Sequence, residues 1–321
     1  ALLIIMAGIY LIITRTAKWQ AMASTLLSFS LFAFGSIQIV GYTVTNPFKR
    51  AKSMLNPLNL KHLNRIDEHA ADMITLNLED AIAPSRKKEA LHNIALFLSY
   101  MEHANSFIIV RTNPLDEGGA EEIAFLNDFG FDAVRIAKVK NQTEIAQALT
   151  LLSADKELHI SLETKEAFES LSTLHIDERL TTANLGILDL LTSLDLPQSL
   201  VTLENPTIDY ILSKFLVDAK TAGIHPISFM FQNYNDTNTF KAWCEREKMM
   251  GFATKACMGP KQVQIANEIF SKKSSEIERA LHIKEAFETH AAQGINGFMD
   301  EKYGFIDEPI YRDSLLKLNK I

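Results

Sequence analysis

Cysteine, net positive charge and glycine-rich loops are scarce in this sequence, and each shortage excludes a class of protein. The chain of 321 residues has two cysteines, Cys244 and Cys257, which cannot supply a disulfide framework or a cysteine-based zinc site. We expect both to be reduced thiols in the core of a cytosolic domain. The formal net charge of −7 argues against a nucleic-acid partner, because phosphate contacts require clustered lysine and arginine.

Charge is missing altogether from residues 19–48, and most of the side chains in this run are apolar. The run is long enough to cross a bilayer. Basic residues flank it on both sides, so its orientation is undecided, and no clean cleavage site supports a signal peptide. We therefore expect residues 1–48 to be a separate apolar segment, either a transmembrane anchor or a buried appendage or artefact of a wrongly assigned gene start.

Beyond residue 48, short β-rich runs alternate with longer amphipathic stretches. The eight strand candidates begin at Lys52, Met73, Phe107, Ala133, Leu158, Leu185, Ile227 and Gly251. Strands that alternate with helices must run parallel, because each crossover returns the chain to the same edge of the sheet. Eight such units predict an α/β fold, a (β/α)₈ TIM barrel, over residues 49–271. A doubly wound open sheet is the alternative, and the lack of a glycine-rich phosphate fingerprint disfavours it.

Residues 272–321 depart from this alternation. The pattern predicts one long helix, then a loop punctuated by glycine, then a short last helix. We expect this part to be a C-terminal helical extension that serves as a lid.

Charged residues end most of the predicted strands, at the edge where a TIM barrel carries its active site. In chain order they are Glu79, Asp80, Arg111, Lys138, Glu163 and Asp189. Any one of them alone could begin a solvated loop or form an ion pair at the barrel mouth. A succession that converges on one edge predicts an active site instead.

The types of these residues indicate a metal. Glu163 and Asp189 lie on adjacent predicted strands, and two carboxylates with open coordination positions suit Mg²⁺. No histidine ends a predicted strand, which disfavours zinc. The planar donor fork of Arg111 suits either a substrate carboxylate or a developing enolate oxygen.

Lys138 and Asp80 each have two interpretations. A lysine at a barrel strand end can form a Schiff base when its pKa is depressed, but the acidic residues around Lys138 favour its charged form, which binds substrate. Asp80 is either a general base or a group that supports the metal ligands.

Six motifs occur in an order that resembles the citrate lyase β-subunit family of the HpcH/HpaI aldolase superfamily. They are "LNLEDAIAPSRKKEA", "IIVRTNPL", "SLETKEAF", "LGILDL", "GFATKACMGPKQV" and "YGFIDEP", and the resemblance runs from about Lys52 to the C-terminus. It implies a Mg²⁺-dependent TIM barrel that makes or cleaves a C–C bond in an acyl thioester. Family substrates are citryl, malyl or citramalyl thioesters of coenzyme A or an acyl carrier protein.

The resemblance also implies roles for individual residues. Glu163 and Asp189 match the metal ligands, and Arg111 matches an arginine that contacts the substrate. Glu79 and Asp80 match the last two positions of a D-L-E-D motif, and we assign both to catalysis. Asp307 resembles a C-terminal aspartate that acts at a neighbouring subunit's site, so a homo-oligomer is expected.

Several motif positions depart from the family pattern. Asn77 stands where the family has the first Asp of D-L-E-D, and Ala137 and Gly259 replace residues of P-K and H-P motifs. The opening strand and its Pro-Gly turn, near the coenzyme A site of relatives, are reduced to "KSMLNPLN". These departures put coenzyme A binding in more doubt than metal binding.

Three functions follow from these observations. The first is a Mg²⁺-dependent C–C lyase acting on a hydroxy-diacid acyl thioester, which yields a keto acid and an acetyl thioester. The second is a lyase or aldolase on a free hydroxy- or oxo-acid without coenzyme A, and the third is a non-catalytic membrane-tethered relative. Because the expected substrates are cytoplasmic metabolites, we expect the barrel to lie in the cytoplasm, tethered or not.

Overall fold

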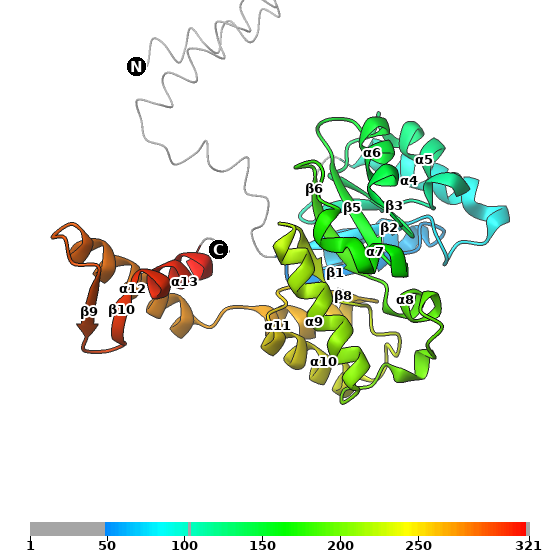
Figure 1. The fold of residues 1–321 in the computed structure, drawn as a ribbon. Coiled ribbons are helices and arrows are strands. Elements are labelled where there is room, and N and C mark those ends of the chain that lie inside the picture. Colours follow the sequence, from blue (N-terminus) through cyan, green and yellow to red (C-terminus); the bar gives the residue numbers. More distant parts are fainter. Residues whose placement is uncertain (1–48, 102–103, 319–321) are drawn as a thin grey trace, which may run out of the picture. The chain divides into compact units, whose positions relative to one another are not determined.

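A parallel eight-stranded sheet forms the centre of the computed structural model, which describes residues 49–101 and 104–318 (Figure 1). The sheet order is β7-β6-β5-β4-β3-β2-β1-β8, and every neighbouring pair is parallel. The strands are β1 (Ala51–Leu55), β2 (Met73–Asn77), β3 (Phe107–Arg111), β4 (Ala133–Ile136), β5 (Glu157–Leu162), β6 (Leu180–Leu185), β7 (His225–Ile227) and β8 (Lys255–Cys257). A parallel bridge between Ser228 and Lys255 joins the two ends of this order, so the sheet nearly closes into a barrel.

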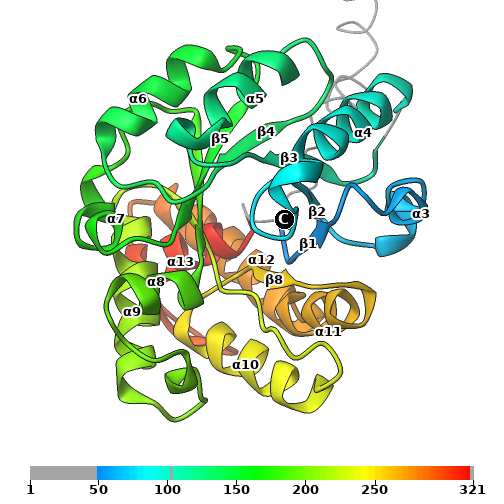
Figure 2. The same cartoon turned by 90° about the vertical axis from the view of Figure 1, so that its right-hand side faces the viewer.

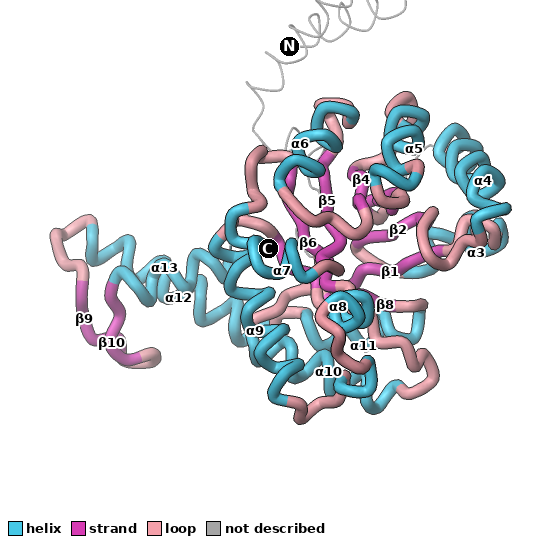
Figure 3. Tube along the Cα trace, turned by 45° about the vertical axis from the view of Figure 1, so that its right-hand side comes forward, coloured by secondary structure: helices cyan, strands magenta, loops and turns pink. Residues whose placement is uncertain are grey.

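Helices follow the strands in turn and form a ring around them (Figures 2 and 3). They are α3 (Leu60–Leu63), α4 (Lys87–Tyr100), α5 (Gly119–Leu126), α6 (Gln142–Leu151), α7 (Lys165–Ser170), α8 (Ile187–Ser193), α9 (Pro206–Thr221), α10 (Thr237–Met250) and α11 (Pro260–Phe270). The main hydrophobic core lies between the strands and these helices. The predicted TIM barrel is therefore confirmed.

Local sequence signals set the ends of these elements. Helix α9 begins where the Asn205 side chain accepts hydrogen bonds from the backbone N–H groups of Thr207 and Ile208, with Pro206 in its first turn. The helix is followed by Gly223, whose φ of 76° lies in the left-handed region that glycine adopts without strain. All five residues of β2 are buried, as expected for a parallel strand covered on both faces.

Two predicted strands are placed wrongly by the sequence pattern. The run that begins at Leu185 was predicted as a strand, but Leu185 is the last residue of β6 and the run continues as helix α8. A short apolar run fits a buried strand and a buried helix equally well, which explains the error. The strand predicted from Ile227 is also largely wrong, because β7 starts at His225 and ends at Ile227.

The C-terminal extension has a small hydrophobic core of its own. Helix α12 (Ser274–Ala291) and helix α13 (Glu308–Leu318) pack together beside an antiparallel hairpin of β9 (Gly297–Asp300) and β10 (Gly304–Asp307) (Figure 3). Ile283, Phe287 and Ile306 are buried among them. Both helices agree with the sequence pattern, whereas the loop predicted between them is a hairpin.

Both cysteines are buried free thiols, as predicted. The apolar segment predicted over residues 1–48 lies outside the residues that the structure describes. Across residues 49–101 and 104–318, no helix combines the length and apolar character needed to cross a membrane.

Candidate active site

The carboxyl ends of β2, β3, β4 and β5 bring together most of the charged residues singled out by the sequence. Glu79 lies two residues beyond β2, Arg111 is the last residue of β3, and Glu163 directly follows β5. Neighbouring parallel strands end at the same edge, so these three side chains meet in spite of their separation in the chain.

Arg111 is the hub of this cluster. Its Nη1 lies 3.0 Å from Glu79 Oε2, and its Nη2 donates to Glu163 Oε1 at 2.8 Å. All three side chains are almost fully buried. The guanidinium is therefore fixed between two carboxylates, and its charge is balanced within the site.

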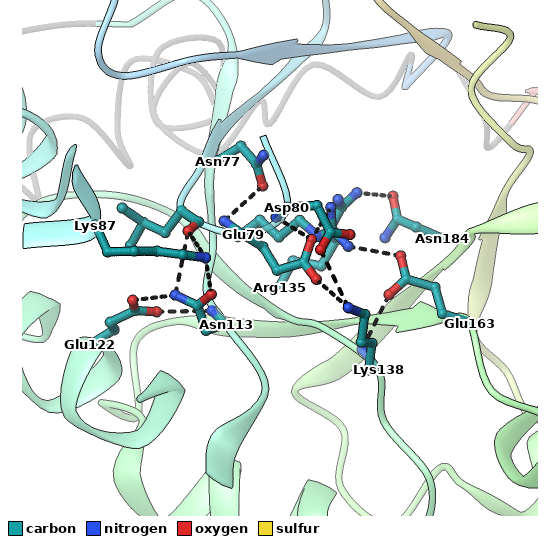
Figure 4. Close-up of polar contacts among 12 residues, drawn as sticks. Asn77, Glu79, Asp80, Lys87, Asn113, Glu122, Arg135, Lys138, Glu163 and Asn184 are labelled. Carbon is teal, nitrogen blue, oxygen red and sulfur yellow. Dashed lines mark hydrogen bonds and ion pairs between the residues drawn. The ribbon is translucent and has the colours of Figure 1, made fainter. Parts of the chain in front are cut away.

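Lys138 closes the cluster on the side of Asp80. Its Nζ lies 3.0 Å from Glu79 Oε1 and 3.3 Å from Asp80 Oδ1, while its backbone N–H donates to Glu163 Oε2 at 3.2 Å. Figure 4 shows Glu79, Asp80 and Glu163 gathered around Lys138. The φ of 51° at Lys138 lies in the left-handed region, which is strained for a residue other than glycine. Such a conformation persists only where the contacts around it stabilise it.

The charge of Lys138 follows from these contacts. Burial opposes ionisation, but the hydrogen bond and charge of Glu79, together with Asp80, raise the pKa of the Lys138 ammonium above its usual value. Schiff-base chemistry needs a neutral amine. The surroundings of Lys138 therefore favour a fixed cation over a nucleophile.

Asp189 reaches the site from a helix. It lies in the first turn of α8, four residues after the end of β6. Its side chain lines a cavity together with Asp80, Arg111 and Glu163. The cavity has a volume of about 200 Å³. The prediction that Asp189 lies at a strand end is wrong, because the residue lies in the first turn of α8.

The carboxylate of Asp189 has no hydrogen-bond or ion-pair partner among the described residues. Burial, and then the nearby carboxylates of Glu163 and Asp80, raise the pKa of its carboxyl above the usual value. Three carboxylates facing one cavity repel each other unless a cation lies between them. Oxygen ligands of this kind suit Mg²⁺, which keeps several waters and needs only one or two protein carboxylates. No group of three metal-ligating side chains close enough to enclose an ion occurs in residues 49–101 and 104–318.

Gly186 makes room for Glu163. A Cβ at Gly186 would lie 2.3 Å from Glu163 Cγ and 2.6 Å from its Oε1. The Glu163 side chain cannot move aside without losing its hydrogen bonds from Arg111 and from the backbone N–H of Lys138. The glycine is thus required by the close approach of β6 to the carboxylate.

We expect Gly186→Ala to lower the free energy of unfolding by about 1–3 kcal/mol, because overpacking displaces Glu163 from its buried partners. Urea unfolding followed by circular dichroism measures the change. Gly130→Ala is the matched control, since a Cβ at Gly130 meets nothing within 4 Å. If the two variants unfold within 0.5 kcal/mol of each other, the close-packing role of Gly186 is wrong.

Glu79 and Asp307 differ from the other predicted residues. Glu79 contacts Arg111 and Lys138 but does not line the cavity, so it positions those two cations. Asp307 ends β10, and its Oδ1 accepts a hydrogen bond from the backbone N–H of Ile310 in α13. The structure does not place Asp307 among the residues that line the cavity.

Two networks were missed by the sequence analysis. Lys87, in α4, donates to Leu78 O and to Asn113 Oδ1, and Asn113 donates to Glu122 Oε1 at 2.5 Å (Figure 4). This network anchors the loop that carries Glu79.

The second network is inside the barrel, where Asn184 Oδ1 accepts from Lys52 Nζ at 2.5 Å and from Arg135 Nη1 at 3.3 Å. The only sequence signal for it is the presence of charged residues within apolar strand patterns.

A second cavity of about 660 Å³ adjoins the first. Met54 lines both cavities. The second is also lined by His62, Arg65, His69 and Tyr234. Glu68 also lines it and pairs with Arg65, so the second cavity offers space and a mixed set of charged side chains beside the first.

Comparison with known proteins yields one consistent group of matches. A sequence model described as HpcH/HpaI aldolase/citrate lyase matches residues 56–260. A (3S)-malyl-CoA thioesterase of Cereibacter sphaeroides is 31% identical over 229 residues, which cover 70% of this chain and 78% of the relative. The citrate lyase subunit beta of Leuconostoc mesenteroides subsp. cremoris is 25% identical, and the match covers 75% of this chain and 82% of the relative.

Solved structures agree on the fold. Protein CitE from Mycobacterium tuberculosis, in complex with magnesium, acetoacetate and coenzyme A, superposes with a TM-score of 0.66 at 16% sequence identity. The match covers 84% of this chain and 97% of that chain. At this level of identity the likeness shows a shared fold and nothing further.

Proposed function

The chain belongs to the HpcH/HpaI aldolase/citrate lyase family, and from this membership we propose that it is a Mg²⁺-dependent carbon–carbon lyase of a hydroxy-diacid thioester of coenzyme A. The family predicted from the motifs is thereby confirmed. The observation that carries the activity is the cavity in which Asp80, Arg111, Glu163 and Asp189 meet. The products are a keto acid and an acetyl thioester.

Glu163 and Asp189 are the residues that would hold Mg²⁺. The unpaired carboxylate of Asp189 and its repulsion by Glu163 support this assignment. When bound, the ion supplies Lewis-acid polarisation of the substrate's hydroxyl or keto oxygen. A relative of the same fold binds magnesium together with a keto acid, which agrees with the proposal.

Arg111 stabilises negative charge as the C–C bond breaks. Bond cleavage leaves an electron pair on the acetyl carbon, and the charge is shared with the thioester oxygen as an enolate. The guanidinium lines the cavity and is held rigid by Glu79 and Glu163, so it need not reorganise during the reaction. Such preorganised donors contribute about 3–4 kcal/mol each.

Asp80 is the proposed base for the substrate's hydroxyl proton. Its side chain lines the cavity, and Lys138 lies 3.3 Å from its Oδ1. Burial opposes ionisation, yet the contacts with Glu79 and Lys138 hold the pKa of the Asp80 carboxyl below its usual value. The group is therefore ionised at neutral pH, which is the form that a base requires. Lys138 orients Asp80 and contributes to binding an anionic substrate.

Asp307 would act on the acetyl carbon of a neighbouring copy's substrate. Its absence from the cavity of its own chain supports a role across an oligomer interface. In this proposal residues 49–271 form the catalytic barrel, and residues 272–321 form an extension that completes a partner's site in a homo-oligomer.

The second cavity favours a thioester over a free acid. It is large enough for part of the coenzyme, and it shares Met54 with the first cavity. Arg65 and His62 add basic groups to its lining, where Glu68 pairs with Arg65. The shortened opening motif is the observation that favours the free-acid alternative. We place the barrel in the cytoplasm, where such thioesters are made, whether or not residues 1–48 tether it to a membrane.

The test is to incubate the protein with malyl-, citramalyl- and citryl-CoA, with and without Mg²⁺, and to identify products by mass spectrometry. We expect acetyl-CoA and the corresponding keto acid from at least one substrate, only when Mg²⁺ is present. Release of free coenzyme A with an intact hydroxy acid would instead indicate hydrolysis, the activity named for one relative. Cleavage of the free hydroxy acids alone would favour the second function, and no turnover of any substrate would contradict a lyase.

A further inference from the structure

Arg135 is a buried cation whose nearest carboxylates, Glu163 and Glu79, act on it only from beyond ion-pair distance. It lies on β4, its side chain lines the reaction cavity, and the residue is 5% exposed. The other arginine of the cavity, Arg111, contacts two carboxylates. Arg135 has no ion pair with a carboxylate among the described residues. A buried charge that lacks a counter-ion is costly, and the cost falls when a ligand supplies one.

The hydrogen bonds of Arg135 are also incomplete. Its Nη1 donates to Asn184 Oδ1 at 3.3 Å, and its buried Nε has no hydrogen-bond partner within residues 49–101 and 104–318. The same amide oxygen accepts from Lys52 Nζ at 2.5 Å. Figure 4 shows the contact between the arginine and Asn184 beside Glu163. Two basic side chains therefore share one neutral acceptor.

A second polar group in this part of the barrel lacks a partner. Ser161, on β5, lines the cavity, and its buried hydroxyl makes no hydrogen bond to the part of the chain that the structure describes. Its register partner on β6 is Asn184. A guanidinium and a hydroxyl with free donors, facing one cavity, match the acceptors of a carboxylate.

We propose that Arg135 is a substrate-binding residue that selects a keto acid carrying a second carboxylate. The inference rests on the proposed function, in which Glu163 and Asp189 would hold the Mg²⁺ that polarises the keto oxygen of the ligand. Those acids and Arg135 line the same cavity of about 200 Å³, so one small keto diacid can contact the metal site and Arg135 together. The thioester substrate then carries two free carboxylates, one more than a malyl or citramalyl thioester.

Oxaloacetate and pyruvate test this selectivity, because they differ only by the second carboxylate. In the presence of Mg²⁺, isothermal titration calorimetry should show that the wild-type protein binds oxaloacetate about 10–100-fold more tightly than pyruvate, as expected for one charged hydrogen-bonded contact. Arg135→Gln should bring oxaloacetate to the affinity of pyruvate and leave pyruvate within threefold. Arg135→Lys, which keeps the charge but loses the fork, should fall between them.

Arg86→Gln is the control, since Arg86 is a half-exposed arginine that pairs with Glu89 away from the cavity. A wild-type protein without preference for the diacid, or an Arg135→Gln protein that loses both ligands equally, would overturn the proposal. Mg²⁺-dependent binding of pyruvate separates this failure from failure of the lyase itself, because a protein that binds neither acid loses both proposals. Should Arg135→Gln not fold by circular dichroism, the wild-type ratio and Arg135→Lys decide.

Discussion

Asp189→Asn is expected to lower Mg²⁺-dependent lyase turnover by about a thousandfold or more. The variant keeps the shape of the side chain but removes a negative charge from a cavity that already holds Glu163 and Asp80. Polarisation by the metal is worth several kcal/mol, and about 4 kcal/mol corresponds to a factor of 10³ in rate. The measurement is kcat for acetyl-CoA release as a function of Mg²⁺ concentration.

Folding is not expected to suffer from this substitution. Asp189 makes no hydrogen bond within the described residues, and a neutral amide removes both causes of its raised pKa, the burial of a charge and the repulsion by Glu163 and Asp80. Asp195→Asn, an exposed position just past the same helix, is the matched control and should keep full activity. Turnover by Asp189→Asn within tenfold of the wild type would exclude Asp189 as a metal ligand.

Arg111→Gln is expected to reduce kcat by about 10²–10³, the usual effect of removing one preorganised donor to a developing oxyanion. The substitution also leaves Glu79 and Glu163 without their shared cation. Breaking a buried ion pair in this way costs about 3–5 kcal/mol of stability. Both kcat and urea unfolding are therefore measured.

Arg179→Gln separates the two effects. Arg179 is a partly buried arginine paired with Asp177, directly before β6 and at the opposite end of the strand from Gly186. Its loss should reduce stability without changing kcat. A folded Arg111→Gln protein that keeps kcat within fivefold would show that Arg111 only supports the fold.

The barrel could be predicted from the sequence because the alternation of strands and helices leaves few other topologies. The meeting of the charged residues could also be predicted, because parallel strands all end at the same edge of the barrel. Glu79, Arg111 and Glu163 lie at or just after strand ends. Asp189 is different. Asp189 follows Gly186, the residue between the end of β6 and the start of α8, and a short apolar run does not show this change from strand to helix.

Arg135 could not be identified from the strand-end rule, because it lies within β4 and not beyond its end. Residues of a barrel strand alternate between the interior and the helices, and the sequence does not show which set faces inward. For the same reason Lys52 was read only as part of a weak strand. The hairpin of the C-terminal extension was missed because its strands have four residues each, too few for a clear alternation.

A crystal structure of the protein with Mg²⁺ and a keto acid is the most direct test of the central claim. The account predicts a single ion bound to carboxylate oxygens of Glu163 and Asp189 at about 2.0–2.1 Å, with the ligand between that ion and Arg111. An ion bound elsewhere, or a keto acid bound away from both Glu163 and Asp189, would contradict it.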